Sequence, residues 1–188
     1  PVVAGVNDGT ESFVGAGLAV AGRAVDAGGT SGGFGLCWHS LLSGAGVMGG
    51  DGLLPGLFIA GGAMAATGKA LDWFQESILD NALSVEQIIA EAASTPAGAE
   101  GLLFLPYLAG ERSPHWDAKA RGVWVGLTLR HQRGHLARAI LEGAAFALRD
   151  VAQRVLDSGG QVQEMRVCGG PARSEVWNQI KADVTGFR

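Results

Sequence analysis

The sequence has few cysteines, little charge and no long uninterrupted apolar run, and each shortage excludes a class of protein. Its two cysteines, Cys37 and Cys168, stand in separate apolar, strand-like segments, which favours buried free thiols in a reducing compartment over a disulfide. Charged residues make up 17% of the chain, the net charge is −4 and no basic patch is visible, so nucleic acid is not an expected partner. The longest apolar stretch, residues 53–66, is too short to span a bilayer and contains Pro55 and several glycines, so no membrane association is expected. No secretory signal is recognisable, and we expect a cytoplasmic protein.

Glycine and apolar residues are abundant instead. Apolar residues make up 47% of the 188 residues, which is enough for the core of one domain and excludes a disordered chain. The 31 glycines lack a three-residue period, which excludes collagen and indicates tight turns and close approach of the backbone to a ligand. The sequence begins directly in a strand-like segment and stops just after a helix-like one. We therefore expect a fragment of a longer protein, cut at both ends.

The order of the expected elements favours an α/β fold, a mixed sheet with helices packed against it. Apolar periodicity and turn residues predict helices over residues 10–19, 65–79, 134–156 and 174–184, and a further helix that starts at Ser84. Strands are predicted over residues 2–5, 24–29, 34–38, 57–60, 102–105, 123–127 and 165–168. Residues 43–52 and 106–121 are expected to be loops, and a loop as long as the second is often functional.

Asp8 directly follows the first predicted strand and has two compatible interpretations. It can cap the next helix, because Asp8 and Glu11 have the spacing of a capping box. It can also act as a general base at a strand end, because the dipole of a following helix keeps an aspartate ionised. Local sequence leaves both interpretations open.

Residues 30–33 join two predicted strands, and together with Gly29 at the end of the first strand they have the sequence GTSGG. Read as G-x-S-x-G they would make Ser31 a hydrolase nucleophile, but that motif needs a helix after the turn, and a strand is predicted there. Read as a glycine-rich hairpin turn, they can offer backbone N–H groups and the Thr30 hydroxyl to phosphate oxygens. An ordinary hairpin without function remains the third interpretation.

Two further segments carry candidate polar groups. Gly169 and Gly170 join a strand to a helix, where glycines let a ligand approach the backbone and a helix N-terminus attracts phosphate. Ser174 there is also a suitable helix cap. His131 and His135 are four residues apart, but the helix is predicted to start at Gly134 between them and no third ligand is evident, so no metal site is predicted.

Several segments, taken in order, resemble the FGGY carbohydrate kinases, a family that includes xylulose, glycerol, gluconate and ribulose kinases. These segments resemble the xylulokinase branch most, and the resemblance covers nearly the whole chain. It is carried by PVVAGVNDG at 1–9, GGTS at 28–31, GAMAATGKALDW at 62–73, LFLPYLAGERSPHWD at 103–117, ARG at 120–122, LEG at 141–143 and CGGPARSEVWN at 168–178.

The resemblance implies a fold, a domain arrangement and an activity. The fold is an actin-like, ribonuclease-H-like ATPase domain, and residues 1–188 would be most of the C-terminal, nucleotide-binding domain of a two-domain kinase. The N-terminal domain, with most sugar contacts, would be missing, so the fragment alone is expected to be inactive. The whole enzyme would use ATP and Mg²⁺ to phosphorylate a hydroxyl of a sugar or polyol, with a xylulose-like pentulose favoured. A homodimer is one candidate assembly.

The resemblance also assigns roles to single residues. Asp8 matches the catalytic base that takes the proton from the sugar hydroxyl, although the family usually has glycines where Val6 and Asn7 stand. Gly29 and Thr30 match a turn that contacts phosphate.

Four further residues match parts of the nucleotide site. Gly68 matches a helix start beside the nucleotide, with Asp72 a further candidate. Gly169, Gly170 and Ser174 match the loop beside the adenosine; Pro171 departs from the family's small residue there and removes one N–H donor.

Two other functional classes stay open at this point. One is a noncatalytic, actin-like nucleotide-binding module, and the other is the serine hydrolase that would use Ser31. The role of Glu111 and Arg112 is also open, because a loop at the edge of a cleft and a contact between subunits both fit their position in the long loop.

Overall fold

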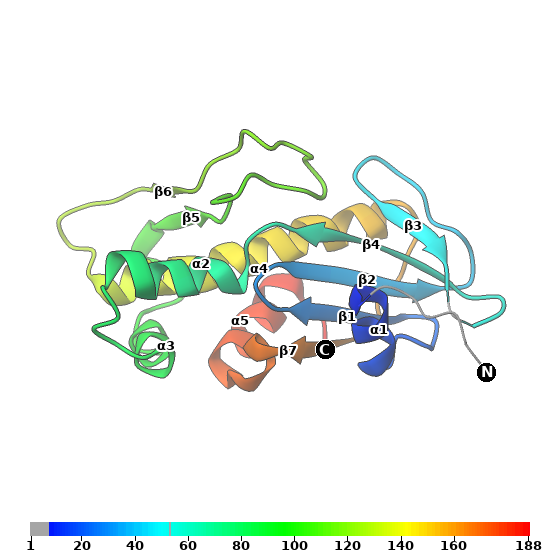
Figure 1. Cartoon of the computed structure of the whole chain (residues 1–188), viewed down its shortest axis with the longest axis horizontal. Helices are drawn as coiled ribbons and strands as arrows, with labels where there is room; N and C mark the ends of the chain where they lie inside the picture. The colour runs from blue at the N-terminus through cyan, green and yellow to red at the C-terminus, as the bar shows by residue number, and fades with distance from the viewer. Residues whose placement is uncertain (1–7, 53) are drawn as a thin grey trace.

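A computed structural model describes residues 8–52 and 54–188 and contains a five-stranded mixed sheet. The strands lie in the order β3-β4-β2-β1-β7 (Figure 1). β1 and β7 pair in parallel, and the other neighbours pair antiparallel. Their bounds are β1 Arg23–Gly28, β2 Gly32–Trp38, β3 Met48–Asp51, β4 Phe58–Met64 and β7 Glu164–Gly169. The mixed α/β prediction is confirmed, whereas the strand predicted over residues 2–5 lies outside the described residues.

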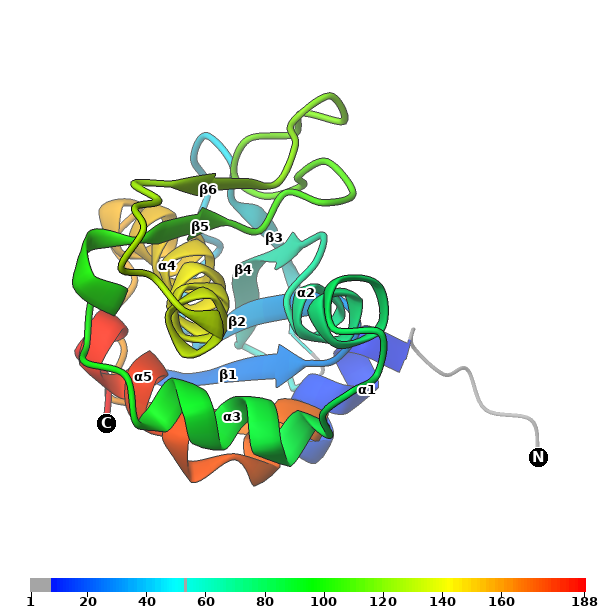
Figure 2. The same cartoon turned by 90° about the vertical axis from the view of Figure 1, so that its left-hand side faces the viewer.

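Helices cover both faces of this sheet. The 25-residue helix α4, Arg133–Asp157, lies between the sheet and a two-stranded ribbon of β5, Leu103–Leu105, and β6, Val123–Val125 (Figure 2). The other helices are α1 Asp8–Gly15, α2 Gly68–Trp73 with a π-helical continuation Phe74–Ile78, α3 Val85–Ala93 and α5 Glu175–Thr185. Short 3₁₀ turns occupy Ala99–Gly101 and Gly170–Arg173. Among the described residues, no helix is both long and apolar enough to cross a membrane.

The core follows the two-residue alternation of the central strands. Phe34 and Leu36 of β2 face α4 and pack with Leu148 and Val151 of that helix. Cys37, the next residue of β2, faces the opposite side, where a smaller cluster forms under α1. Both cysteines are free thiols, as predicted, but only Cys37 is buried, and Cys168 is half-buried. Burial raises the pKa of the Cys37 thiol.

A buried ion pair ties the last helix to the sheet. Nζ of Lys181 on α5 lies 2.5 Å from Oδ2 of Asp26 on β1, and the two side chains are only 7% and 4% exposed. The Lys181 ammonium also lies 5.3 Å from the ring centre of Trp177. Nε1 of Trp177 donates to the Leu141 carbonyl of α4 at 3.1 Å. α5 is therefore fixed to both β1 and α4 by polar contacts within the core.

Several predicted boundaries are wrong. The strand predicted over residues 57–60 is β4, which continues to Met64, and the helix predicted over residues 65–79 starts at Gly68. Residues 48–51, expected to be loop, form β3, an exposed edge strand that pairs with β4 although it contains two glycines. α1 starts at Asp8 and ends at Gly15, so it starts and stops earlier than predicted. The turn that follows the helix contains Gly17, where φ is +94° and an added Cβ would lie 2.6 Å from Nη1 of Arg166. Because Asp8 is the first helical residue, the capping position falls outside the described residues.

Candidate functional site

The turn between β1 and β2 is the centre of the candidate site. Gly28 and Gly32 are paired at the base of the hairpin, and the Gly29 N–H donates to the Ser31 carbonyl at 2.9 Å. Thr30 and Ser31 at its tip are exposed. The predicted hairpin is confirmed, and it removes the structural basis for a hydrolase: Ser31 is followed by strand β2 rather than by the helix that a nucleophile elbow requires.

The start of α2 packs against this turn and is hydrogen-bonded to it. The N–H groups of Gly68 and Lys69 donate to the carbonyls of Gly29 and Thr30 at 3.0 and 3.1 Å. A Cβ on Gly68 would lie 2.3 Å from the Gly29 carbonyl oxygen, so only glycine permits this approach. The Gly68 N–H therefore positions the turn. Gly68 contributes to a ligand site by allowing α2 to pack closely against that turn.

The loop after β7 lies beside the same turn. β1 and β7 run parallel with Gly28 opposite Gly169, so both loops leave the carboxyl ends of parallel strands, where α/β sheets bind ligands. Gly169 has φ +84°, and a Cβ there would lie 1.7 Å from the Gly28 carbonyl oxygen. Gly170 has no atom within 4 Å of an added Cβ, so its backbone borders open space.

Ser174 begins α5 at the end of this loop. Its hydroxyl accepts a hydrogen bond from the Trp177 N–H at 3.1 Å, so the helix-cap interpretation is confirmed. The 11-residue helix α5 directs the positive end of its dipole towards the loop after β7. A phosphate bound beside this loop would be stabilised by that dipole.

A cavity of about 730 Å³ opens between these elements. It brings together five of the residues that the sequence predicts to bind nucleotide: Gly29, Thr30, Gly68, Gly170 and Ser174. Gly169 adjoins it through Gly170, and the further candidate Asp72 also lines it. Sequence reasoning missed its apolar wall, which consists of Leu71, Val85, Ile89, Val176 and Trp177. The volume is within the range of pockets that bind small organic ligands.

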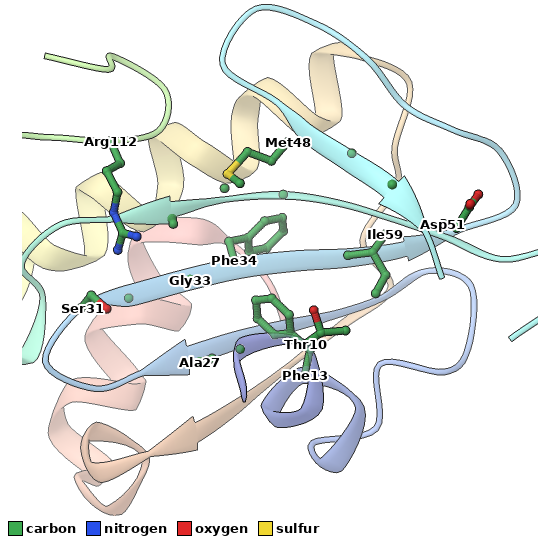
Figure 3. A pocket seen from close by; sticks show the side chains of 17 residues that line it. Thr10, Phe13, Ala27, Ser31, Gly33, Phe34, Met48, Asp51, Ile59 and Arg112 are labelled. Atoms are coloured by element: carbon green, nitrogen blue, oxygen red, sulfur yellow. The ribbon is translucent and has the colours of Figure 1, made fainter. Parts of the chain in front are cut away.

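A second cavity, of about 540 Å³, lies on the other side of the turn (Figure 3). Ser31, Gly32 and Gly33 of the turn and of β2 line it, together with Gly9 and Thr10 of α1. The β1–β2 turn therefore separates two cavities and borders both. The backbone of Asp8, at the start of α1, precedes residues that line this second cavity, while its side chain lies outside the described part of the chain.

The long loop at 106–121 reaches this second cavity through Arg112. Glu111, which is 5% exposed, anchors the loop: its Oε1 accepts hydrogen bonds from the N–H groups of Ala65 and Arg112, both at 2.7 Å. Nη2 of Arg112 donates to the Met64 carbonyl at 2.9 Å. Arg112 therefore lies at the edge of a cavity, in agreement with one of the two roles that the sequence left open for Glu111 and Arg112.

The two histidines have local structural partners. Nδ1 of His131 accepts from the Thr128 N–H at 2.9 Å, just before α4 begins. Nδ1 of His135, in the first turn of α4, accepts from the N–H of Gln132, the residue before that helix, at 3.0 Å. No group of three histidine, cysteine, aspartate or glutamate side chains that could hold a metal ion is found in the described part of the chain.

Comparison with known proteins shows the family. Residues 25–188 match the model of the C-terminal domain of the FGGY family of carbohydrate kinases. A xylulose kinase of Escherichia coli is 38% identical over 99% of this chain, which corresponds to 38% of that protein. The crystal structure of xylulose kinase from Rhodospirillum rubrum has a TM-score of 0.88 at 37% identity over 96% of this chain and 36% of the other.

More distant structures share the fold. The glycerol kinase of Plasmodium falciparum, solved with ADP, has a TM-score of 0.83 at 21% identity. The curated relatives include both xylulose and glycerol kinases, and this chain spans 38% of the length of the Escherichia coli xylulose kinase and 23% of that of a Rhodopirellula baltica glycerol kinase. The matched residues contain the whole sheet except the first two residues of β1, with both loops of the candidate site. The chain belongs to the FGGY family of carbohydrate kinases and has the actin-like fold of that family's C-terminal domain.

Proposed function

We propose that this chain is the nucleotide-binding domain of a kinase that transfers the γ-phosphoryl group of ATP to a hydroxyl of a sugar or polyol, with a xylulose-like pentulose favoured. One observation carries the proposal: three segments that are far apart in sequence meet in one cavity at the carboxyl ends of β1 and β7. They contribute Thr30, Gly68 and Ser174 to its lining. The xylulose kinases among the relatives support the choice of acceptor.

The volume and the lining of the cavity support the proposal of a nucleotide site. Its apolar wall, formed by side chains such as Leu71 and Ile89, suits a heteroaromatic base, while the turn and the start of α5 suit phosphate. Close backbone packing at Gly68 and Gly169 leaves no room for side chains there and keeps the phosphate end open. The ADP in the Plasmodium glycerol kinase agrees with this assignment at the level of the fold.

The second cavity would hold the acceptor and the reacting groups. Asp8, at the start of α1, would accept the proton of the attacking hydroxyl as its oxygen approaches the phosphorus. Thr30 and Ser31 would contact the terminal phosphate at the turn between the two cavities. Mg²⁺ would neutralise charge on the phosphates when bound, and because it keeps several waters it needs few protein ligands.

The rest of the enzyme would supply most sugar contacts. The chain spans 38% of the length of the Escherichia coli xylulose kinase, and the second cavity has a solvent-exposed side. We propose that an N-terminal domain closes over this side and excludes water, which otherwise competes with the sugar as acceptor.

An acceptor panel tests the proposal. The natural protein that carries this chain is incubated with MgATP and each of a pentulose, a hexulose, glycerol and an aldonate, and ADP formation is followed in a coupled assay. We expect acceptor-dependent turnover, fastest with the pentulose. Nucleotide binding without turnover on any acceptor would identify a noncatalytic nucleotide-binding module instead.

Filling the larger cavity should weaken nucleotide binding without unfolding the domain. Gly170→Val adds a side chain where no atom lies within 4 Å of the new Cβ, so the backbone need not move. We expect the Kd for MgADP, measured by calorimetry, to rise by about tenfold or more, which is about 1.4 kcal/mol.

A second glycine provides the matched control. Gly15→Val also adds its side chain in open space, at the end of α1, and Gly15 lines neither cavity. This variant should bind MgADP as the wild type does. Equal affinities for the two variants would mean that Gly170 does not border the nucleotide.

A further inference from the structure

We infer that Arg112 is a phosphate-contacting residue, which binds the terminal phosphate of the nucleotide and neutralises the charge on the phosphoryl group during transfer. This inference rests on the proposed function and adds a residue to it. It starts from the one motif of the long loop whose role the sequence left open.

Arg112 is held in place by its surroundings. The buried carboxylate of Glu111 binds the N–H groups of Ala65 and Arg112, and the Ser113 N–H donates to the Ala63 carbonyl at 2.9 Å. These bonds dock the loop onto the end of β4. A guanidinium held by a buried anchor loses little entropy when it binds a ligand.

The guanidinium lies at the end of the cavity where the β1–β2 turn is. Figure 3 shows the Arg112 side chain extending from the loop towards the turn, on the side of Ser31. Of the described residues that line this cavity, only Asp51 and Arg112 are charged, and Asp51, the last residue of β3, lies at the far end. Among the described residues that line this cavity, Arg112 therefore carries the positive charge, and it lies beside the turn.

Among the described residues, the Arg112 side chain binds one carbonyl, and its remaining donors have no partner there that would compete with a ligand. A guanidinium has five N–H donors, and Nη2 donates to the Met64 carbonyl. No carboxylate among the described side chains lies within 4.0 Å of it, whereas Arg23, Arg133 and Arg138 each have such a partner. A fixed, exposed arginine without a carboxylate partner in this part of the chain suits phosphate oxygens, which its planar fork binds in pairs.

The reaction places negative charge at this position. The acceptor oxygen forms a bond to the γ-phosphorus, and the bond from that phosphorus to the oxygen bridging the β and γ groups breaks. The electron pair of the broken bond stays on ADP, and the hydroxyl proton goes to Asp8. Charge is spread over the three equatorial oxygens of the phosphoryl group at this moment, and Arg112 would donate hydrogen bonds to them.

The test compares Arg112→Met and Arg112→Lys with Arg130→Met in the natural protein. Arg130 is exposed in the loop before α4 and lines neither cavity. Turnover is measured with the acceptor panel, and binding of MgADP and of a slowly hydrolysed MgATP analogue is measured by calorimetry. We expect Arg112→Met to lower kcat by roughly 10²-fold or more, because arginines in this role contribute 10³ to 10⁵ elsewhere. Arg112→Lys keeps the charge but loses the fork and should fall between Arg112→Met and the wild type.

The binding measurements separate a phosphate contact from a structural role. Loss of the terminal-phosphate contact should weaken binding of the MgATP analogue, while the affinity for MgADP and the melting temperature stay at the wild-type values. Wild-type kcat and an unchanged preference for the analogue in Arg112→Met would overturn the inference, as would a parallel loss of MgADP affinity and melting temperature in both Arg112 variants. If the wild type turns over no acceptor, the proposed function fails, and the preference for the analogue over MgADP still decides the role of Arg112.

Discussion

Replacing Asp8 by asparagine is expected to lower turnover of the natural protein by roughly 10²- to 10⁴-fold, the range that a positioned general base contributes. Asparagine has nearly the same shape as aspartate, but its amide cannot accept the proton of the attacking hydroxyl. MgADP affinity should stay near the wild-type value, because the proposed nucleotide cavity is lined by other elements. A coupled assay for ADP release and a calorimetric titration measure the two quantities.

The control for this variant lies on the same helix. Glu11→Gln removes one negative charge from an exposed side chain of α1 that lines neither cavity, and its turnover should equal that of the wild type. A different result would contradict the assignment: an equal loss of turnover and MgADP affinity in Asp8→Asn, with a lower melting temperature, would mean that Asp8 only supports the start of the helix.

Replacing Lys181 by methionine should destabilise the domain by about 3–5 kcal/mol, because it leaves the carboxylate of Asp26 buried without its counter-charge. Since a domain of 150–250 residues loses about 2–4 °C of melting temperature per kcal/mol, the loss should be about 6–20 °C. Denaturant and thermal unfolding measure it. Asp26→Asn should have a similar effect, because the Lys181 ammonium is then unpaired.

Two further variants separate burial from charge. Lys69→Met breaks an exposed ion pair with Glu76, at 3.3 Å, and should change the stability by about 1 kcal/mol or less. The double variant Asp26→Leu with Lys181→Met removes both buried charges and should recover much of the lost stability. A loss below about 1 kcal/mol in Lys181→Met would show that the buried pair does not hold α5 to the sheet.

The elements that local sequence specifies strongly were predicted correctly. The β1–β2 hairpin follows from a glycine-rich turn between two apolar segments, and α4 follows from an apolar stripe at helical spacing. Ser84 and Ser174 cap α3 and α5 as their position before apolar segments indicates. In these cases the chemistry of one segment is sufficient, and neighbouring segments agree with it.

The features that depend on distant partners were missed. β3 contains two glycines and has no buried residue, so only its pairing with β4 makes it a strand. Val85 and Ile89 of α3 reach the larger cavity because α3 contacts both α4 and α5, and no local pattern indicates a ligand there. Gly15 and Gly17 end helix α1 before residue 19, where the run of small apolar residues predicted its end.

The candidate site was predicted in part for the same reason. The glycines at 29, 68 and 170 stand out in the sequence because each adjoins a turn or an element end, and they do line one cavity. Glu111 could not be assigned, because its role depends on the N–H of Ala65, 46 residues earlier in the chain. The position of Arg112 over the second cavity follows from that contact.

Hydrogen–deuterium exchange of the natural protein, with and without saturating MgADP, tests most directly whether this domain binds the nucleotide where we propose. Backbone amides of the β1–β2 turn, of the start of α2 and of the loop after β7 with the start of α5 should exchange more slowly in the complex, because they border one cavity. Amides of the β5–β6 ribbon, on the other side of α4, should not change. Saturating MgADP that protects none of these three segments, or protects only residues outside this chain, would contradict the account.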